Sequence, residues 1–170
     1  MKRSFLPLFI LALIIAASIS TIGQTRKTII LVRHAEKEAA ETDMSGDPDL
    51  SSIGKERAER LAKIVGKYRV GAVYSSDTKR TRETAEPSAK RRHLEIQTYD
   101  PRKQDDLVKL ILASKTKRFL IVGHSNTIPK LAGLFMKKDL FKDLDDDEYG
   151  TIWIIRIRPG RLPSVQVISY

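Results

Sequence analysis

Cysteine is absent from this sequence of 170 residues. The chain therefore cannot form a disulfide, bind a metal through thiolates, use a cysteine nucleophile or carry a lipid on cysteine. Aromatic residues are scarce as well, at 6% of the chain, and they do not interleave with the basic runs as base-stacking platforms would. This scarcity argues against a nucleic-acid partner, although the formal net charge of +10 suits an anionic partner of some kind.

Charged residues are also missing from the run between Ser4 and Thr25, which follows Lys2 and Arg3. A basic start, an apolar centre and small residues near the end are typical of a secretory signal peptide. If the segment is not cleaved, its length just suffices for a membrane anchor. We assign residues 1–23 to this signal or anchor and residues 24–170 to one folded domain, exported to the periplasm or the cell exterior.

From Lys27 onward, short β-branched runs alternate with longer segments of helical period. This alternation predicts an α/β domain, a three-layer sandwich whose mainly parallel sheet has helices on both faces. The expected strands are 28–34, 70–76, 94–98, 118–124 and a terminal edge pair, and the expected helices are 52–67, 78–91, 105–113 and one beginning near 127. The acidic stretch 143–148 is interpreted as a solvated loop.

Polar residues cluster where three of these predicted strands end: Arg33-His34, Ser75-Ser76 and His124 through Asn126. Ligands of open α/β sheets bind beyond the carboxyl ends of the strands, so the three clusters are expected to converge on one site. His93 lies in a basic run and is interpreted as a surface residue.

Two histidines flanked by anion-binding groups favour phosphoryl chemistry. Cleavage of a phosphate ester has a high barrier, which positive charge and N–H donors around the transferring group lower. Arginine binds phosphate oxygens in pairs, and a histidine beside it can accept the phosphoryl group. Either histidine alone is more simply a structural residue, and only the pair indicates catalysis.

Four segments carry a family resemblance: LVRHAEK, DLSSIGKERAERLA, YSSDTKRTRETAEP and VGHSN. Together they resemble, in the family's own order, the histidine phosphatase superfamily, also called the phosphoglycerate-mutase-like family, over residues 28–134. The resemblance implies that His34 is the phosphate-accepting nucleophile and that His124 hydrogen-bonds the transferring group. It further implies that Arg33 and Arg80 bind the phosphoryl oxygens and that Asn126 donates to phosphate. It implies no metal and no cofactor.

The sequence departs from the family pattern at two places. His34 is followed by Ala-Glu-Lys, which brings Lys37 near the pocket. The block that supplies a proton-donating carboxylate in many relatives is not recognisable; Asp100 is the candidate donor, with Asp105, Asp106 and Glu148 as alternatives. Within the matching blocks, Ser76 and Thr84 are interpreted as a turn residue and a helix-packing residue.

The function expected from these observations is metal-independent hydrolysis of a phosphate ester, or another phosphoryl compound, through a phosphohistidine intermediate. The expected partner is a small phosphorylated substrate, with no nucleic acid, a membrane contact only through residues 1–23, and an undefined oligomeric state. Two alternatives remain open: a catalytically weak envelope module that recognises phosphate, and a phosphatase specific for phosphorylated lipopolysaccharide-core sugars.

Overall fold

A computed structural model describes residues 25–39, 46–139 and 141–170. The predicted signal or anchor, residues 1–23, lies outside these described residues. Within the described ranges, no helix is both long enough and apolar enough to cross a membrane.

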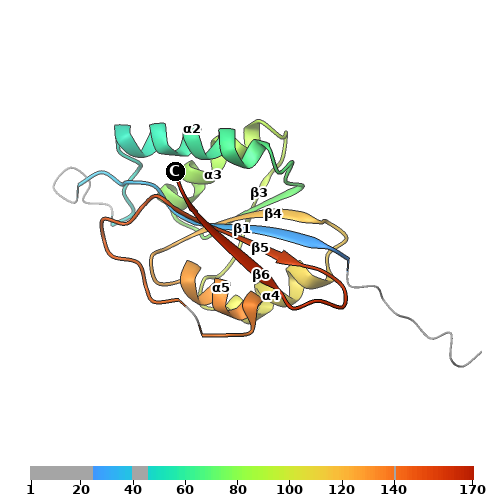
Figure 1. The fold of residues 1–170 in the computed structure, drawn as a ribbon. Helices are drawn as coiled ribbons and strands as arrows, with labels where there is room; N and C mark the ends of the chain where they lie inside the picture. Colours follow the sequence, from blue (N-terminus) through green and yellow to red (C-terminus); the bar gives the residue numbers. More distant parts are fainter. Residues whose placement is uncertain (1–24, 40–45, 140) are drawn as a thin grey trace, which may run out of the picture.

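The centre of the domain is a six-stranded sheet with the strand order β3-β2-β4-β1-β5-β6 (Figure 1). The strands are β1 (Lys27–Arg33), β2 (Ala72–Ser75), β3 (Ile96–Thr98), β4 (Arg118–Gly123), β5 (Thr151–Ile157) and β6 (Ser164–Ser169). Strands β1 to β4 run parallel to one another, whereas β5 is antiparallel to β1 and β6 is antiparallel to β5. The prediction of a mainly parallel sheet with a terminal edge pair is confirmed.

Within the described residues, two helices cover each face of the sheet, which gives the predicted three layers (Figure 1). Helices α2 (Ser52–Gly66) and α3 (Lys79–Lys90) lie on one face, and α4 (Gln104–Ala113) and α5 (Ile128–Met136) lie on the other. The Ser51 hydroxyl accepts a hydrogen bond from the Gly54 amide and so caps α2, as its position before the helix predicts.

Strand β1 is buried on both faces, which explains its uninterrupted apolar sequence. Successive side chains of a strand point to opposite faces of the sheet. Accordingly, Ile29 and Leu31 belong to the core under α4 and α5, while Ile30 and Val32 belong to the core under α2 and α3. A central strand with helices on both sides has no solvent-facing position to mark with a polar residue.

The loop that follows β1 packs closely against the first turn of α2. An ideal Cβ built on Gly54 would clash with the carbonyl oxygen of Glu36, whereas one built on Gly66 would meet nothing within 4 Å. The Glu36 carboxylate also accepts hydrogen bonds from Arg57 of α2, with the Nε at 2.8 Å from both of its oxygens. Helix α2 therefore fixes the backbone just after residue 34.

We expect Gly54→Ala to lower the free energy of unfolding by about 2 kcal/mol, because the new methyl group must displace the Glu36 backbone. Gly66→Ala lies in the same helix with open space around it, and should change the stability by less than about 1 kcal/mol, in the stabilising direction. Urea unfolding of both variants measures the two effects. Equal stabilities would show that the contact with Glu36 is not constraining.

Candidate active site

The polar residues at the strand ends converge because β2, β4 and β1 are adjacent and parallel. Arg33 pairs with Gly123 and Ser75 pairs with Val122, so the three carboxyl ends lie at one edge of the sheet. A cavity of about 530 Å³ opens at this edge. Five of the predicted residues line it, namely Arg33, His34, Arg80, His124 and Asn126. The rings of the two histidines lie with their centroids 5.5 Å apart.

His34 is held in one orientation by backbone and side-chain hydrogen bonds. Its Nδ1 lies 2.8 Å from the carbonyl oxygen of Ala35. A carbonyl oxygen only accepts, so Nδ1 carries the proton and Nε2 of the neutral ring keeps a free electron pair. The amide of Ala35 donates to Thr84 Oγ1 at 2.9 Å, and that hydroxyl donates to the carbonyl oxygen of Arg80. Thr84 thus links the loop that contains His34 to α3.

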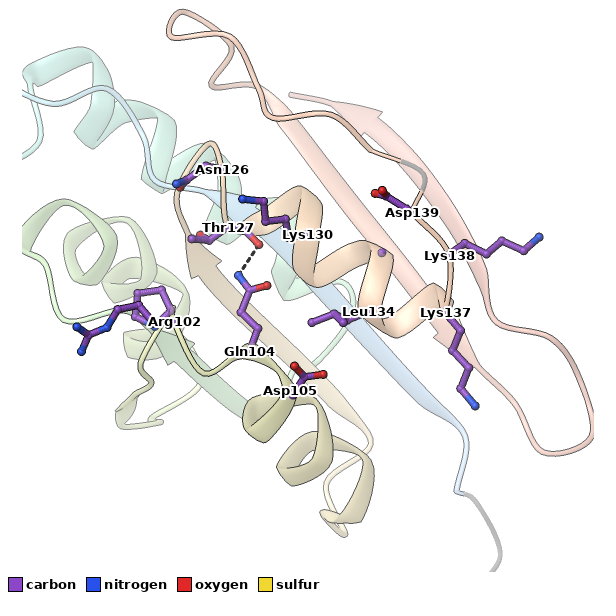
Figure 2. Close-up of a pocket in the computed structure, with 12 residues that line it drawn as sticks. Arg102, Gln104, Asp105, Asn126, Thr127, Lys130, Leu134, Lys137, Lys138 and Asp139 are labelled. Atoms are coloured by element: carbon purple, nitrogen blue, oxygen red, sulfur yellow. Dashed lines mark hydrogen bonds between the residues drawn. The ribbon is translucent and has the colours of Figure 1, made fainter.

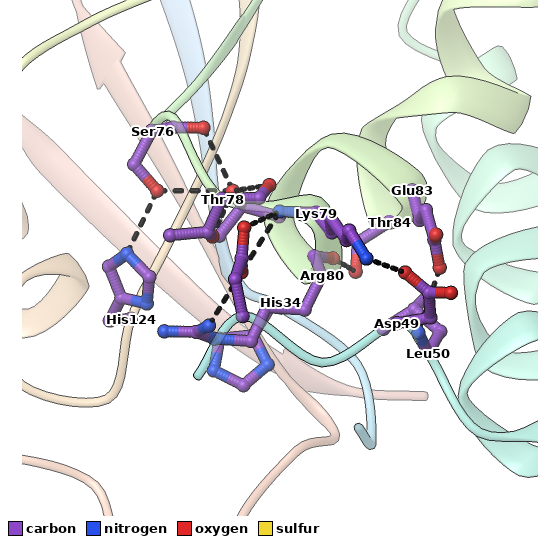
Figure 3. A network of polar contacts seen from close by, with 12 residues as sticks. His34, Asp49, Leu50, Ser76, Thr78, Lys79, Arg80, Glu83, Thr84 and His124 are labelled. Atoms are coloured by element: carbon purple, nitrogen blue, oxygen red, sulfur yellow. Dashed lines mark hydrogen bonds and ion pairs between the residues drawn. The ribbon is translucent and has the colours of Figure 1, made fainter. Parts of the chain in front are cut away.

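His124 is oriented by Ser76, whose Oγ lies 2.8 Å from the Nε2 of its ring (Figure 3). The Ser76 Oγ also lies 3.1 Å from Thr81 Oγ1, so Ser76 connects His124 to the start of α3. Ser76 and Thr84, which sequence reasoning treated as turn and packing residues, therefore position the two imidazoles. Their location in the motif blocks was the available signal, but their partners depend on tertiary contacts.

Both imidazoles are kept neutral by their surroundings. Burial lowers the pKa of His34 to about 3, and the charges of Arg80, His124 and Arg33 act in the same direction. Burial likewise lowers the pKa of His124 to about 4, helped by Arg80 and Arg33 and opposed by Asp47. The two rings are therefore unprotonated bases at neutral pH, in a cavity whose walls carry positive charge.

Arg80 and Lys79 are tied to the segment that precedes α2. The Arg80 Nη1 lies 3.1 Å from Asp47 Oδ1, and the same carboxylate accepts from the backbone amide of Lys79 (Figure 3). The Lys79 Nζ also lies 3.2 Å from Asp49. These contacts hold the guanidinium of Arg80 beside the cavity at the start of α3.

Arg33 is buried and holds the C-terminal acidic stretch against the cavity. Its Nη1 donates to the carbonyl oxygens of Asp145 at 2.7 Å and Glu148 at 3.0 Å, and its Nη2 donates to that of Asp146 at 3.1 Å. The guanidinium lies 4.1 Å from the centre of the Tyr149 ring. Among the described atoms, its buried Nε has no hydrogen-bond partner.

The acidic stretch 143–148 is consequently more than the solvated loop that its composition predicted. Asp146 and Tyr149 line the same cavity as the histidines, and the Tyr149 ring centroid lies 6.0 Å from that of His34. Sequence reasoning missed both residues because the contacts that recruit the stretch are made by backbone carbonyl groups. Lys37 lines the same cavity as His34, whereas His93 is exposed as predicted.

None of the four proposed proton donors lines the cavity that contains His34. Asp100 faces a neighbouring cavity of about 400 Å³ that it shares with His124. Its carboxylate accepts three hydrogen bonds from Arg102, and the side-chain bond is the main reason that the pKa of Asp100 is lowered. Asp105 and Asp106 lie in the first turn of α4, and the Glu148 carboxylate accepts from Thr151.

The low pKa values of the histidines predict an acid-sensitive fold. An unfolded imidazole has a pKa of about 6.5. Below that pH the unfolded chain binds more protons than the folded protein, whose rings titrate at about 3 and about 4. The free energy of unfolding should therefore fall as the pH is lowered from about 6.5. Urea titrations between pH 7.5 and 5 measure this dependence. The free energy of unfolding should fall less steeply with decreasing pH in His34→Asn and His124→Asn than in the unmodified protein. The exposed-site control His93→Asn should show the same pH dependence as the unmodified protein.

Comparison with known families and proteins agrees with the motif blocks. Residues 29–102 match the family described as the histidine phosphatase superfamily, branch 1. Phosphoserine phosphatase 1 of Hydrogenobacter thermophilus is 41% identical over 71 residues, which are 40% of this chain and 34% of that protein. The match thus spans only about a third of that curated relative.

Solved structures share the fold over most of the chain. The alpha-ribazole phosphatase of Shigella flexneri has a TM-score of 0.69 at 14% identity, over 85% of this chain and 96% of the other. The phosphoserine phosphatase of Entamoeba histolytica, solved with 3-phosphoglyceric acid, has a TM-score of 0.65 at 15% identity, over 85% and 98%. The ordered motifs agree with the family match, so residues 29–102 resemble the histidine phosphatase superfamily, and the similar structures show that the chain shares their fold.

Proposed function

We propose that this protein is a phosphatase that hydrolyses a phosphate ester, without a metal ion, through a phosphohistidine intermediate on His34. The observation that carries the proposal is the orientation of that ring. Its Nδ1–H donates to the Ala35 carbonyl, and its Nε2 electron pair remains free in the cavity that also contains His124 and Arg80. The family match and the phosphatases among the similar proteins support the same class of reaction.

In the first step, the His34 Nε2 electron pair attacks phosphorus, an N–P bond forms and the bond from phosphorus to the leaving oxygen breaks. The leaving oxygen takes up a proton. In the second step, water attacks the phosphohistidine, the N–P bond breaks and inorganic phosphate leaves. The Nδ1–H bond to Ala35 supports this sequence because it fixes the ring and stabilises the positive charge that develops on it.

Charge around the cavity suits the transferring phosphoryl group. The guanidinium of Arg80, together with Lys37 and Asn126, lines the wall. Arg33 also lines the cavity and adds positive charge, although its terminal nitrogens already donate to carbonyl groups. These contacts use three of its five N–H groups, so that among the described atoms the buried Nε and one Nη2 hydrogen remain for an oxyanion. We assign the main hydrogen bonds to phosphate oxygens to Arg80, and the electrostatic attraction to both arginines.

The identity of the proton donor separates two versions of the proposal. Asp100 is paired with Arg102, which favours its ionised form, whereas a general acid must hold a proton. Asp146 lines the nucleophile's cavity, with its backbone carbonyl held by Arg33. We therefore propose Asp146 as a rival donor to Asp100. If neither acts, the substrates are compounds with good leaving groups, such as phosphoramidates or anhydrides.

The alternative function is a catalytically weak module of the cell envelope that recognises phosphate. The engagement of the Arg33 terminal nitrogens by carbonyl groups is the observation that favours it. Residues 1–23 and the net charge of +10 support an exported protein acting on anionic envelope material. Phosphorylated lipopolysaccharide-core sugars are one such substrate class.

The central prediction concerns covalent chemistry at His34. Incubation of residues 24–170 with ³²P-labelled phenyl phosphate and EDTA should label the protein through a bond that is labile in acid and stable in base, as a phosphohistidine is. His34→Ala should abolish both the label and phosphate release, and His93→Ala should leave them unchanged. Phosphate binding without release from the unmodified protein would favour the recognition module. If His34→Ala retained turnover, the assignment of His34 as the nucleophile would be wrong.

The proton donor is identified by comparing how much its removal slows the hydrolysis of substrates with poor and with good leaving groups. Loss of a general acid typically costs about 10²- to 10⁴-fold in rate when the leaving group is poor, and little when it is good. We expect Asp146→Asn to slow the hydrolysis of an alkyl phosphate far more than that of p-nitrophenyl phosphate, with Asp100→Asn as the matched comparison. The reverse result would assign the role to Asp100. Equal effects on both substrates in both variants would exclude both residues.

A further inference from the structure

A second and larger cavity lies between α4 and α5, beside the one that contains His34. Its volume is about 870 Å³, within the range of roughly 300–1,000 Å³ that is typical of small-molecule sites. Figure 2 shows the side chain of Leu134 pointing from α5 toward α4 and that of Gln104 rising between the two helices. The Gln104 side chain donates to the Thr127 carbonyl oxygen at 2.8 Å and so ties the two helices together. The groove is therefore preformed.

The two cavities meet at the loop that follows β4. Asn126 lines both the cavity of His34 and the groove between α4 and α5. A molecule whose phosphoryl group lies against His34 can therefore extend past Asn126 into the groove without crossing a helix. The reacting group and the rest of a substrate would then occupy two adjoining compartments.

The end of the groove nearest to Asn126 is positively charged. Figure 2 shows the side chain of Lys130 extending from α5 toward Asn126, whereas Lys137 and Lys138 extend away from the groove. Lys130 is exposed, and no ion pair joins it to a carboxylate within residues 25–39, 46–139 and 141–170. Two acidic residues also line the cavity: in Figure 2, Asp105 lies beside Leu134 at the far end from Asn126, and Asp139 lies on the side of α5 that faces away from α4. An anion entering from the catalytic cavity therefore meets a free ammonium group first.

We infer that the groove between α4 and α5 binds the non-reacting body of the substrate, and that this body carries a second negative charge that contacts Lys130. The inference rests on the proposed phosphatase function and defines its substrate class: a phosphorylated small molecule with a further carboxylate or phosphate. The body also has an apolar portion, which packs on Leu134, a residue 36% exposed on the groove wall.

The test compares two substrates that differ only in charge. One is 4-(2-carboxyethyl)phenyl phosphate and the other is its methyl ester, which has the same leaving oxygen and nearly the same size. An exposed ion pair typically changes an equilibrium about two- to fivefold. We expect the unmodified protein to prefer the acid over the ester in kcat/KM by about that factor, chiefly through KM. Lys130→Glu should reverse the preference.

Lys63→Glu is the matched control, because Lys63 is exposed on α2, on the opposite face of the sheet, and the substitution changes the net charge equally. This control should keep the preference of the unmodified protein. If Lys130→Glu still hydrolyses both substrates and the ratio of their kcat/KM values is unaltered, the inference is overturned while the phosphatase function stays in place.

Binding of the same two compounds is measured separately by calorimetry, so that the groove is tested even without turnover. If the acid binds more tightly than the ester and Lys130→Glu removes the difference, the groove is supported as a binding site for the charged body of the substrate. If neither compound is hydrolysed in that case, it is the proposed phosphatase function that fails. Equal binding of acid and ester to the unmodified protein would overturn the inference.

Discussion

The parallel pairing of β1 with β4 is the constraint on which the rest of the site depends. It aligns Arg33 with Gly123, so the residues that follow them, His34 and His124, emerge at the same edge of the sheet. The pairing of β2 with the other side of β4 brings Ser76 to the same edge. A shift of one residue in this register would turn each alternating side chain to the opposite face and would separate the two imidazoles. Residues Ile29 to Val32 are apolar on both faces, so the close packing of their side chains, and not an alternation of apolar and polar residues, opposes such a shift.

Burial then determines the chemical state of the site. Both histidines are surrounded by protein and by arginines, so their charged forms are disfavoured and their pKa values are low. A neutral ring with its Nδ1 hydrogen-bonded to a backbone carbonyl is a base with a single available electron pair. The same positive surroundings that hold the ring neutral also attract an anion, so one arrangement of charge would serve both parts of the proposed function, the nucleophile and its phosphorylated substrate.

The C-terminal half of the chain contributes more to the cavity than its sequence indicates. The matched family region ends at residue 102, yet His124, Asn126, Asp146 and Tyr149 all line the cavity. Arg33 connects the two halves through carbonyl oxygens of the acidic stretch 143–148. The groove between α4 and α5 is also built from this second half.

The sequence by itself determined the order and type of the elements, because apolar period, turn residues and continuous buried runs are local properties of the chain. It also determined which strand ends carry polar residues, and the parallel topology that these patterns predict was enough to expect Arg33, His34, His124 and Asn126 at one cavity. Arg80 was expected there only because of the family resemblance. Only the tertiary structure decided that Ser76 and Thr84 orient the two imidazoles, that Asp100 pairs with Arg102, and that the acidic stretch covers the site. These contacts join residues far apart in sequence, several through backbone carbonyl groups that every residue possesses, so no pattern of side chains could have predicted them.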